Sequence, residues 1–146
     1  MKVLIASDHA GLKLKEDLKT NLQNTLKGET IEWMDLGAYN ESSVDYPDMA
    51  QNLCNTLLKN QGDFGVLVCG SGQGMAMKAN RNKGIRAALC WDKPSTQLSR
   101  EHNNANVLCL GGRLIPWGLA REMAQVFLST AYAGGRHENR VKKLDQ

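Results

Sequence analysis

The 146-residue sequence predicts a single α/β domain, spanning residues 1–146, built on a doubly wound five-stranded parallel sheet with helices on both faces. Short apolar runs of strand length alternate with segments whose apolar residues recur at helical spacing. Such alternation builds right-handed βαβ units, which make neighbouring strands parallel and cover both faces of the sheet. The chain length also fits one domain with a substantial core.

The first half of the chain provides three predicted strands, at 3–6, 31–36 and 64–68. A helix is expected between the first two, because leucines there mostly keep helical spacing: Leu12, Leu14, Leu18, Leu22 and Leu26. A second helix is expected to begin at the Pro47-Asp48 pair, since proline favours the first turn of a helix.

The second half predicts strands at 85–90 and 107–110. Helices are expected from about Met75, from about Pro94, and from Pro116 to about Ala131. Two glycines, Gly134 and Gly135, end the last of these before a short final helix.

Composition excludes several classes of protein. The chain is 42% hydrophobic and 23% charged, as in soluble globular proteins, and its net charge of +3 suits an anionic small molecule without requiring nucleic acid. No apolar run reaches the length of a membrane span. Lysines in the first helix (Lys13, Lys15 and Lys19) are expected on a solvated face.

The four cysteines show no Cys-x-x-Cys pair and no zinc spacing. The N-terminus enters a strand directly, without the apolar region of a secretory signal. A reduced, cytoplasmic protein is therefore expected.

Polar residues follow three of the predicted strands: Ser7-Asp8-His9, Cys69-Gly70-Ser71-Gly72 and Gly111-Gly112-Arg113. In doubly wound folds ligands bind beyond the carboxyl ends of the strands. We therefore expect these three groups to converge on one edge of the sheet.

The glycines at 70, 72 and 74 let backbone N–H groups approach a ligand, so the loop can bind a phosphate or stabilise an oxyanion. A dinucleotide site is an alternative, with Asp92 about 20 residues on as the ribose-binding acid. Against it, Met75 stands where the fingerprint has its third glycine.

Cys69 ends its strand and begins the loop, beside amides and a helix N-terminus that lower a thiol pKa. It can act as a base or nucleophile, or simply pack; Cys54, Cys90 and Cys109 are interpreted as packing residues.

His9 and His102 lie in polar runs and suit ligand contact and proton transfer. A metal site formed by Asp8, His9 and His102 is an alternative, but no ligand spacing supports it. Arg136 and Arg140 are four residues apart, so one helical face would carry two guanidinium groups, either solvated or binding a phosphate.

Six motifs, in order, make the chain resemble the type B ribose-5-phosphate isomerases, a family that also includes enzymes acting on galactose 6-phosphate and allose 6-phosphate. They are ASDHAG at 6–11, VDYPD at 44–48, CGSGQGM at 69–75, GIRAALC at 84–90, SREHNNANVL at 99–108 and GGRHENRV at 134–141.

The resemblance implies a Rossmann-like fold and an aldose–ketose isomerisation in the pentose phosphate pathway, through a cis-enediolate, with no metal and no organic cofactor. Cys69 would be the base, His102 would open the sugar ring with help from Asp8, and Ser71 would hold the enediolate oxygen. The other residues implied at the site are the loop residues Gly70, Gly72, Gln73 and Gly74, the sugar contacts Tyr46 and Asn103, and the phosphate contacts His9, Arg136 and Arg140.

The resemblance also implies a homodimer or homotetramer. The site would lie at the subunit interface, with His102 and the C-terminal arginines facing the partner's Cys69. Two alternatives remain open: a hexose 6-phosphate as substrate, and a regulatory module that binds a nucleotide or phosphosugar without turnover.

Overall fold

The computed structural model describes residues 1–22 and 24–146, in which five parallel strands form the central sheet. These strands are β1 (Lys2–Ser7), β4 (Glu32–Asp35), β5 (Phe64–Cys69), β6 (Ala87–Leu89) and β7 (Val107–Gly111). Their order is β4-β1-β5-β7-β6, and every neighbouring pair is parallel. The predicted five-stranded parallel sheet is confirmed, with small shifts in where strands begin and end.

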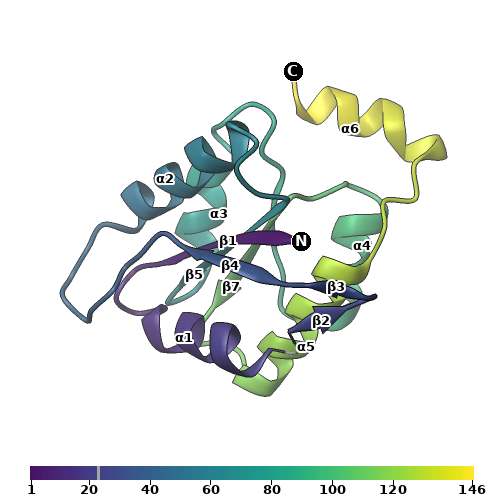
Figure 1. Cartoon of the computed structure of the whole chain (residues 1–146). Coiled ribbons are helices and arrows are strands. Elements are labelled where there is room, and N and C mark those ends of the chain that lie inside the picture. Colours follow the sequence, from purple (N-terminus) through teal and green to yellow (C-terminus); the bar gives the residue numbers. More distant parts are fainter. Residues whose placement is uncertain (23) are drawn as a thin grey trace.

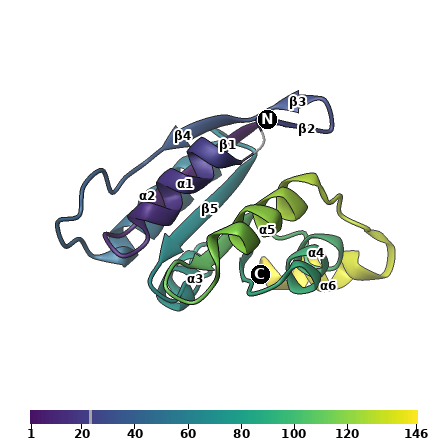
Figure 2. The same ribbon diagram turned by 90° about the horizontal axis from the view of Figure 1, so that it is seen from below.

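Helices cover both faces of this sheet (Figures 1 and 2). They are α1 (Leu12–Asn21), α2 (Tyr46–Leu58), α3 (Gln73–Ala79), α4 (Lys93–Glu101), α5 (Trp117–Ser129) and α6 (Glu138–Leu144), with a 3₁₀ turn, η1 (Gly135–His137), before α6. Helices α1 and α5 pack on one face, and α2 and α3 pack on the other. The doubly wound arrangement is therefore confirmed as well.

Side chains of each central strand alternate between two cores. Ile5 and Val66 belong to the core that contains Phe127 of α5. Leu4 of β1 belongs to the opposite core, with Leu53 of α2. Because both faces are covered, these strands are apolar almost throughout, which is why they were readable in the sequence.

The prediction that Leu26 continues the first helix is wrong. Helix α1 ends at Asn21, and Leu26 lies in β2 (Thr25–Leu26), which pairs antiparallel with β3 (Glu29–Thr30). The two turn residues, Lys27 and Gly28, have φ values of 51° and 82°, as a two-residue hairpin turn requires. Leu26 is nevertheless buried in the core beneath α1 and α5. Its spacing from the preceding leucines therefore indicated a buried position and not a continuation of the helix.

The expectation of a solvated face is also wrong for Lys15, whose side chain is 0% exposed. Its Nζ donates to Asp35 Oδ1 at 2.7 Å and to the Ala38 carbonyl at 2.5 Å. Burial raises the pKa of the Asp35 carboxyl, but hydrogen bonds from Lys15 and Lys19 outweigh it and lower that pKa. The buried ion pair fixes the chain as it leaves β4.

No helix within residues 1–22 and 24–146 combines the length and apolar character needed to cross a membrane.

Candidate active site

A cavity of about 460 Å³ opens where the loops after β1, β5 and β7 meet. We call it the thiol cavity; it is lined by Asp8, His9, Ala10, Tyr46, Cys69, Gly70, Ser71, Gly74, Arg113 and Leu114. From β1 the chain winds outward to β4, and from β5 it winds the other way, so the cavity lies at the switch point of the sheet. The predicted convergence of the three polar groups is confirmed.

The loop after β5 folds back on the thiol. The backbone N–H of Gly72 donates to Cys69 Sγ at 3.1 Å. Gly72 has a φ of 78°, and a Cβ there would lie 2.9 Å from the Leu110 carbonyl carbon. A side chain at this position would therefore break the close packing that holds the loop against β7 and its amide against the sulfur.

Cys69 differs from the other three cysteines, all of which are free thiols. Its side chain lines the thiol cavity, whereas Cys54, Cys90 and Cys109 line none of the cavities that hold the predicted site residues. Burial raises the pKa of Cys54 to about 11 and also raises those of Cys90 and Cys109. This agrees with the interpretation of those three as packing residues, because a protonated buried thiol is inert.

Tyr46 and Gly74 meet on the wall of the cavity. Tyr46 is the first residue of α2, and a Cβ added to Gly74 would lie 2.4 Å from its ring. Real Cβ atoms essentially never come so close, so the glycine is what allows the tyrosine ring to occupy this position.

The loop after β1 is fixed by its own polar side chains. Asp8 Oδ1 accepts the Gly11 N–H at 2.9 Å, and His9 Nδ1 accepts the Val44 N–H at 3.3 Å. An imidazole that accepts at Nδ1 carries its proton on Nε2 when neutral. His9 can therefore offer a donor to an anion in the cavity.

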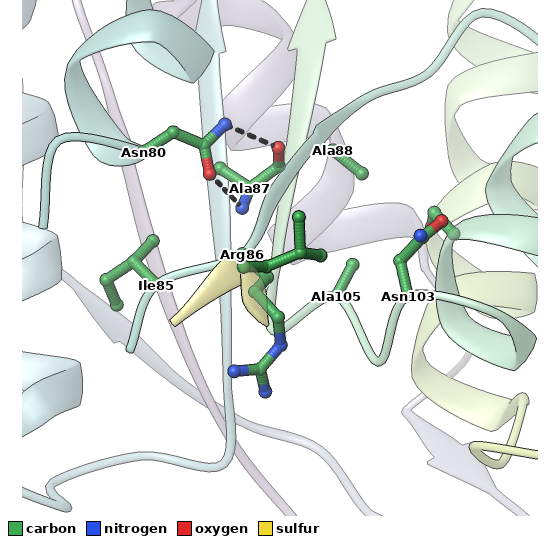
Figure 3. Close-up of a pocket in the computed structure, with 9 residues that line it drawn as sticks. Asn80, Ile85, Arg86, Ala87, Ala88, Asn103 and Ala105 are labelled. Carbon is green, nitrogen blue, oxygen red and sulfur yellow. Dashed lines mark hydrogen bonds between the residues drawn. The ribbon is translucent and has the colours of Figure 1, made fainter. Parts of the chain in front are cut away.

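Six predicted site residues do not line the thiol cavity: Gly72 and Gln73 of the loop after β5, and His102, Asn103, Arg136 and Arg140. We call the last four the distal group. Asn103 lines a second cavity, of about 390 Å³, between β6, α4 and α6 (Figure 3). The rings of His102 and His137 stack with their centroids 4.2 Å apart, which joins the end of α4 to η1.

The two arginines do not share one α-helix, contrary to the prediction. Arg136 lies in η1, and α6 begins only at Glu138. The positive φ of Gly134 and Gly135 turns the chain into a tight 3₁₀ turn first. Arg140 Nη1 still reaches back to the Arg136 carbonyl, at 3.5 Å.

Arg113 is a charged cavity residue that the sequence placed at the sheet edge without a chemical role. It belongs to the Gly-Gly-Arg group after β7, so its place at the carboxyl end of a central strand was the signal. Its guanidinium adds a fixed positive charge beside Gly70.

Asp92, the acid of the dinucleotide alternative, has a structural role. It is the N-cap of α4, where its carboxylate accepts the Ser95 N–H at 2.7 Å in a capping box. The alternative metal site is not supported either, because no three His, Cys, Asp or Glu side chains gather as ligands in the described part of the chain.

Fold and cavity together define a small doubly wound α/β protein with a thiol, a hydroxyl and an imidazole around an amide-rich loop. Over residues 3–144 the chain matches the Ribose/Galactose Isomerase family, and it belongs to that family. The resemblance inferred from the sequence motifs is confirmed.

Named relatives place the chain more closely. It is 44% identical to the Bacillus subtilis protein YwlF, named as a candidate sugar phosphate isomerase, with 99% of this chain and 95% of YwlF covered. It is 35% identical to ribose-5-phosphate isomerase B of Escherichia coli, covering 98% and 93%. The crystal structure of a ribose 5-phosphate isomerase from Thermotoga maritima superposes with a TM-score of 0.91 at 52% identity, covering 99% and 97%. The chain is thus an isomerase of the type B group.

Proposed function

We propose that this chain interconverts ribose 5-phosphate and ribulose 5-phosphate through a cis-enediolate. The observation that carries the proposal is the position of Cys69, on the cavity wall and hydrogen-bonded to the loop that follows it. Relatives named as ribose-5-phosphate isomerases support the choice of sugar.

The isomerisation needs a base and hydrogen-bond donors that stabilise the negative charge of the enediolate. Cys69, as the thiolate, removes the proton from C2 of the open-chain aldose, and the negative charge moves onto the oxygen at C1. Backbone N–H groups of residues 70–74 and the Ser71 hydroxyl stabilise this enediolate oxygen. A proton moves from the oxygen at C2 to the oxygen at C1, and Cys69 returns the carbon-bound proton to C1, which gives the ketose.

The sugar must first be opened, because it arrives mainly as a ring. His102 transfers the proton that opens the furanose, helped by Asp8, while Tyr46 and Asn103 contact hydroxyl groups. His9, Arg136 and Arg140 bind the phosphate. Arg113, which lines the thiol cavity, adds a cation on the same side as Cys69.

We propose that two copies of the chain share these roles, one presenting the base and the other the ring opener. The position of the distal group outside the cavity that holds Cys69 supports this arrangement. A homodimer or homotetramer with the site between subunits would bring the distal group of one chain to the thiol cavity of another.

A side-by-side kinetic assay on ribose 5-phosphate, allose 6-phosphate and galactose 6-phosphate tests the proposal. We expect the highest kcat/KM with ribose 5-phosphate, and no effect of EDTA because the proposed steps use no metal. A higher kcat/KM with either hexose phosphate would show that this sugar, and not ribose 5-phosphate, is the substrate. Thermal stabilisation by AMP or NAD without any turnover would show that the chain is a binding module and not an isomerase of these sugars.

A further inference from the structure

Arg86 joins the two segments that carry the distal group. It precedes β6, and its side chain is 16% exposed. Its Nη1 donates to Asp145 Oδ2, just after α6, at 2.7 Å. Its Nε donates to the Asn104 carbonyl, just after His102 and Asn103, at 2.9 Å. A single guanidinium therefore spans the turn after α4 and the end of α6.

Close packing does not hold the far end of α6 in place. Val141 is the one buried residue among those of α6. Leu144 is 61% exposed and lines the 390 Å³ cavity together with Asn103. The ion pair with Arg86 therefore anchors the end of the helix beside this open space.

The Asp145 carboxylate depends on this ion pair. Its second oxygen, Oδ1, is buried and has no hydrogen-bond partner within residues 1–22 and 24–146. The start of the C-terminal segment is tied separately, by the His102–His137 stack and by the Ala133 N–H donating to the Glu101 carbonyl at 3.0 Å. Loss of the ion pair would therefore loosen α6, which carries Arg140, more than η1, which carries Arg136.

We propose that Arg86, through Asp145, is a positioning residue that sets where Arg140 meets the substrate phosphate. The proposal rests on the proposed function for the role of Arg140. It needs no contact between Arg86 and the substrate. Arg86 suits the role because its own backbone is fixed, with its N–H donating to Asn106 Oδ1 at 2.8 Å.

Steady-state kinetics of Asp145→Asn tests the proposal. We expect KM for ribose 5-phosphate to rise about tenfold with kcat within about twofold, since one charge-assisted contact that places a phosphate ligand is lost while Cys69 is untouched. Asp145→Glu keeps the carboxylate and should restore most of the affinity. Lys142→Gln is the matched control, because it removes only the exposed pair with Glu138 on the same helix, and its KM should stay unchanged.

The double variant Asp145→Asn/Arg140→Ala distinguishes positioning from general destabilisation. If Asp145 acts through Arg140, the second substitution adds almost nothing to the KM of Arg140→Ala. Additive increases in KM, or a fall in kcat with unchanged KM, would overturn the proposal. If the wild-type protein lacks isomerase activity, the proposed function is wrong, and kinetics cannot test the ion pair. Amide hydrogen exchange then tests the ion pair alone. Faster exchange of residues 138–144 in Asp145→Asn supports the positioning role of the ion pair, and unchanged exchange overturns it.

Discussion

At the scale of single residues, the cysteines share one side-chain chemistry and differ in surroundings. Cys54, Cys69 and Cys109 are all buried in the α2–α3 core, but Cys69 also ends β5, where it accepts the Gly72 N–H and lines the thiol cavity. Burial favours the neutral thiol, so a core cysteine resists ionisation. The same residue type therefore serves packing at three positions and chemistry, as we propose, at the fourth.

The raised pKa of Cys54 predicts alkaline destabilisation. Its folded-state pKa is about 11 against an ordinary value of 9.0, so between these pH values the unfolded chain loses a proton that the folded chain keeps. The free energy of unfolding must then fall as pH rises, by up to about 1.4 kcal/mol per pH unit for each such thiol. Urea denaturation from pH 8 to 11 should show a shallower fall in Cys54→Ala, and an unchanged slope would contradict the assignment.

Gly74→Ala should damage the site without unfolding the protein. The new Cβ would displace the Tyr46 ring, and a shift of about 1 Å at a substrate contact can cost about a hundredfold in rate. We expect kcat/KM to fall by tenfold to a hundredfold, roughly, measured with ribose 5-phosphate. Gly118→Ala is the control: its nearest neighbour would be Arg121 Nη2 at 3.9 Å, so activity should be unchanged. Equal activity of both variants would show that the position of the Tyr46 ring does not matter for catalysis.

At the scale of elements, the strands and most helices were predictable because burial imposes a pattern. Strands covered on both faces, such as β5, are apolar along their length, and helices such as α2 keep one apolar face. The predictions for Leu26 and Lys15 were wrong for the same reason. The sequence spacing of an apolar residue and the charge of a lysine do not indicate which distant residues will contact it in the fold. Leu26 packs on the core from a hairpin, and Lys15 is buried by its pairing with Asp35.

Helix α4 carries His102 at its C-terminal end, so its stability bears on the distal group. Asp92→Ala removes the capping box and should lower the melting temperature at pH 7. The hydrogen bonds with Ser95 lower the pKa of Asp92 below its ordinary value of 3.8, so the stabilisation is present above that value and is lost as pH falls through the folded-state pKa. Differential scanning calorimetry should therefore show the two proteins converging at acidic pH. A constant difference would contradict this role of the carboxylate.

At the scale of the whole molecule, convergence at the sheet edge was predictable from the strand pattern, while the separation of the distal group was expected only from the family resemblance. The parallel topology brings the ends of β1, β5 and β7 together, so Asp8, Cys69 and Arg113 had to meet. The segment after α5 has no strand to place it, and its position depends on long-range contacts such as Arg86 to Asp145. Local spacing carries no information about such contacts.

Two inactive variants should restore activity to each other. If the base comes from one subunit and the ring opener from another, a mixed dimer of Cys69→Ala and His102→Ala chains contains one intact site. Random reassortment should give about a quarter of the wild-type activity, since half of the dimers are mixed and each has one intact site of two. Subunit exchange under mild denaturation, followed by an isomerase assay, checks this. No recovery in dimers shown to be mixed would place both groups on one chain.

Cys69 is proposed to remove and return the carbon-bound proton, and turnover of ribose 5-phosphate in D₂O, followed by NMR, tests this role. The wild-type protein should introduce deuterium at C1 of the ketose and C2 of the aldose, because the thiol exchanges its proton with solvent. Cys69→Ala should fold normally yet lose both turnover and deuterium incorporation by several orders of magnitude. A folded Cys69→Ala protein that still incorporates deuterium at near wild-type rates would contradict the account.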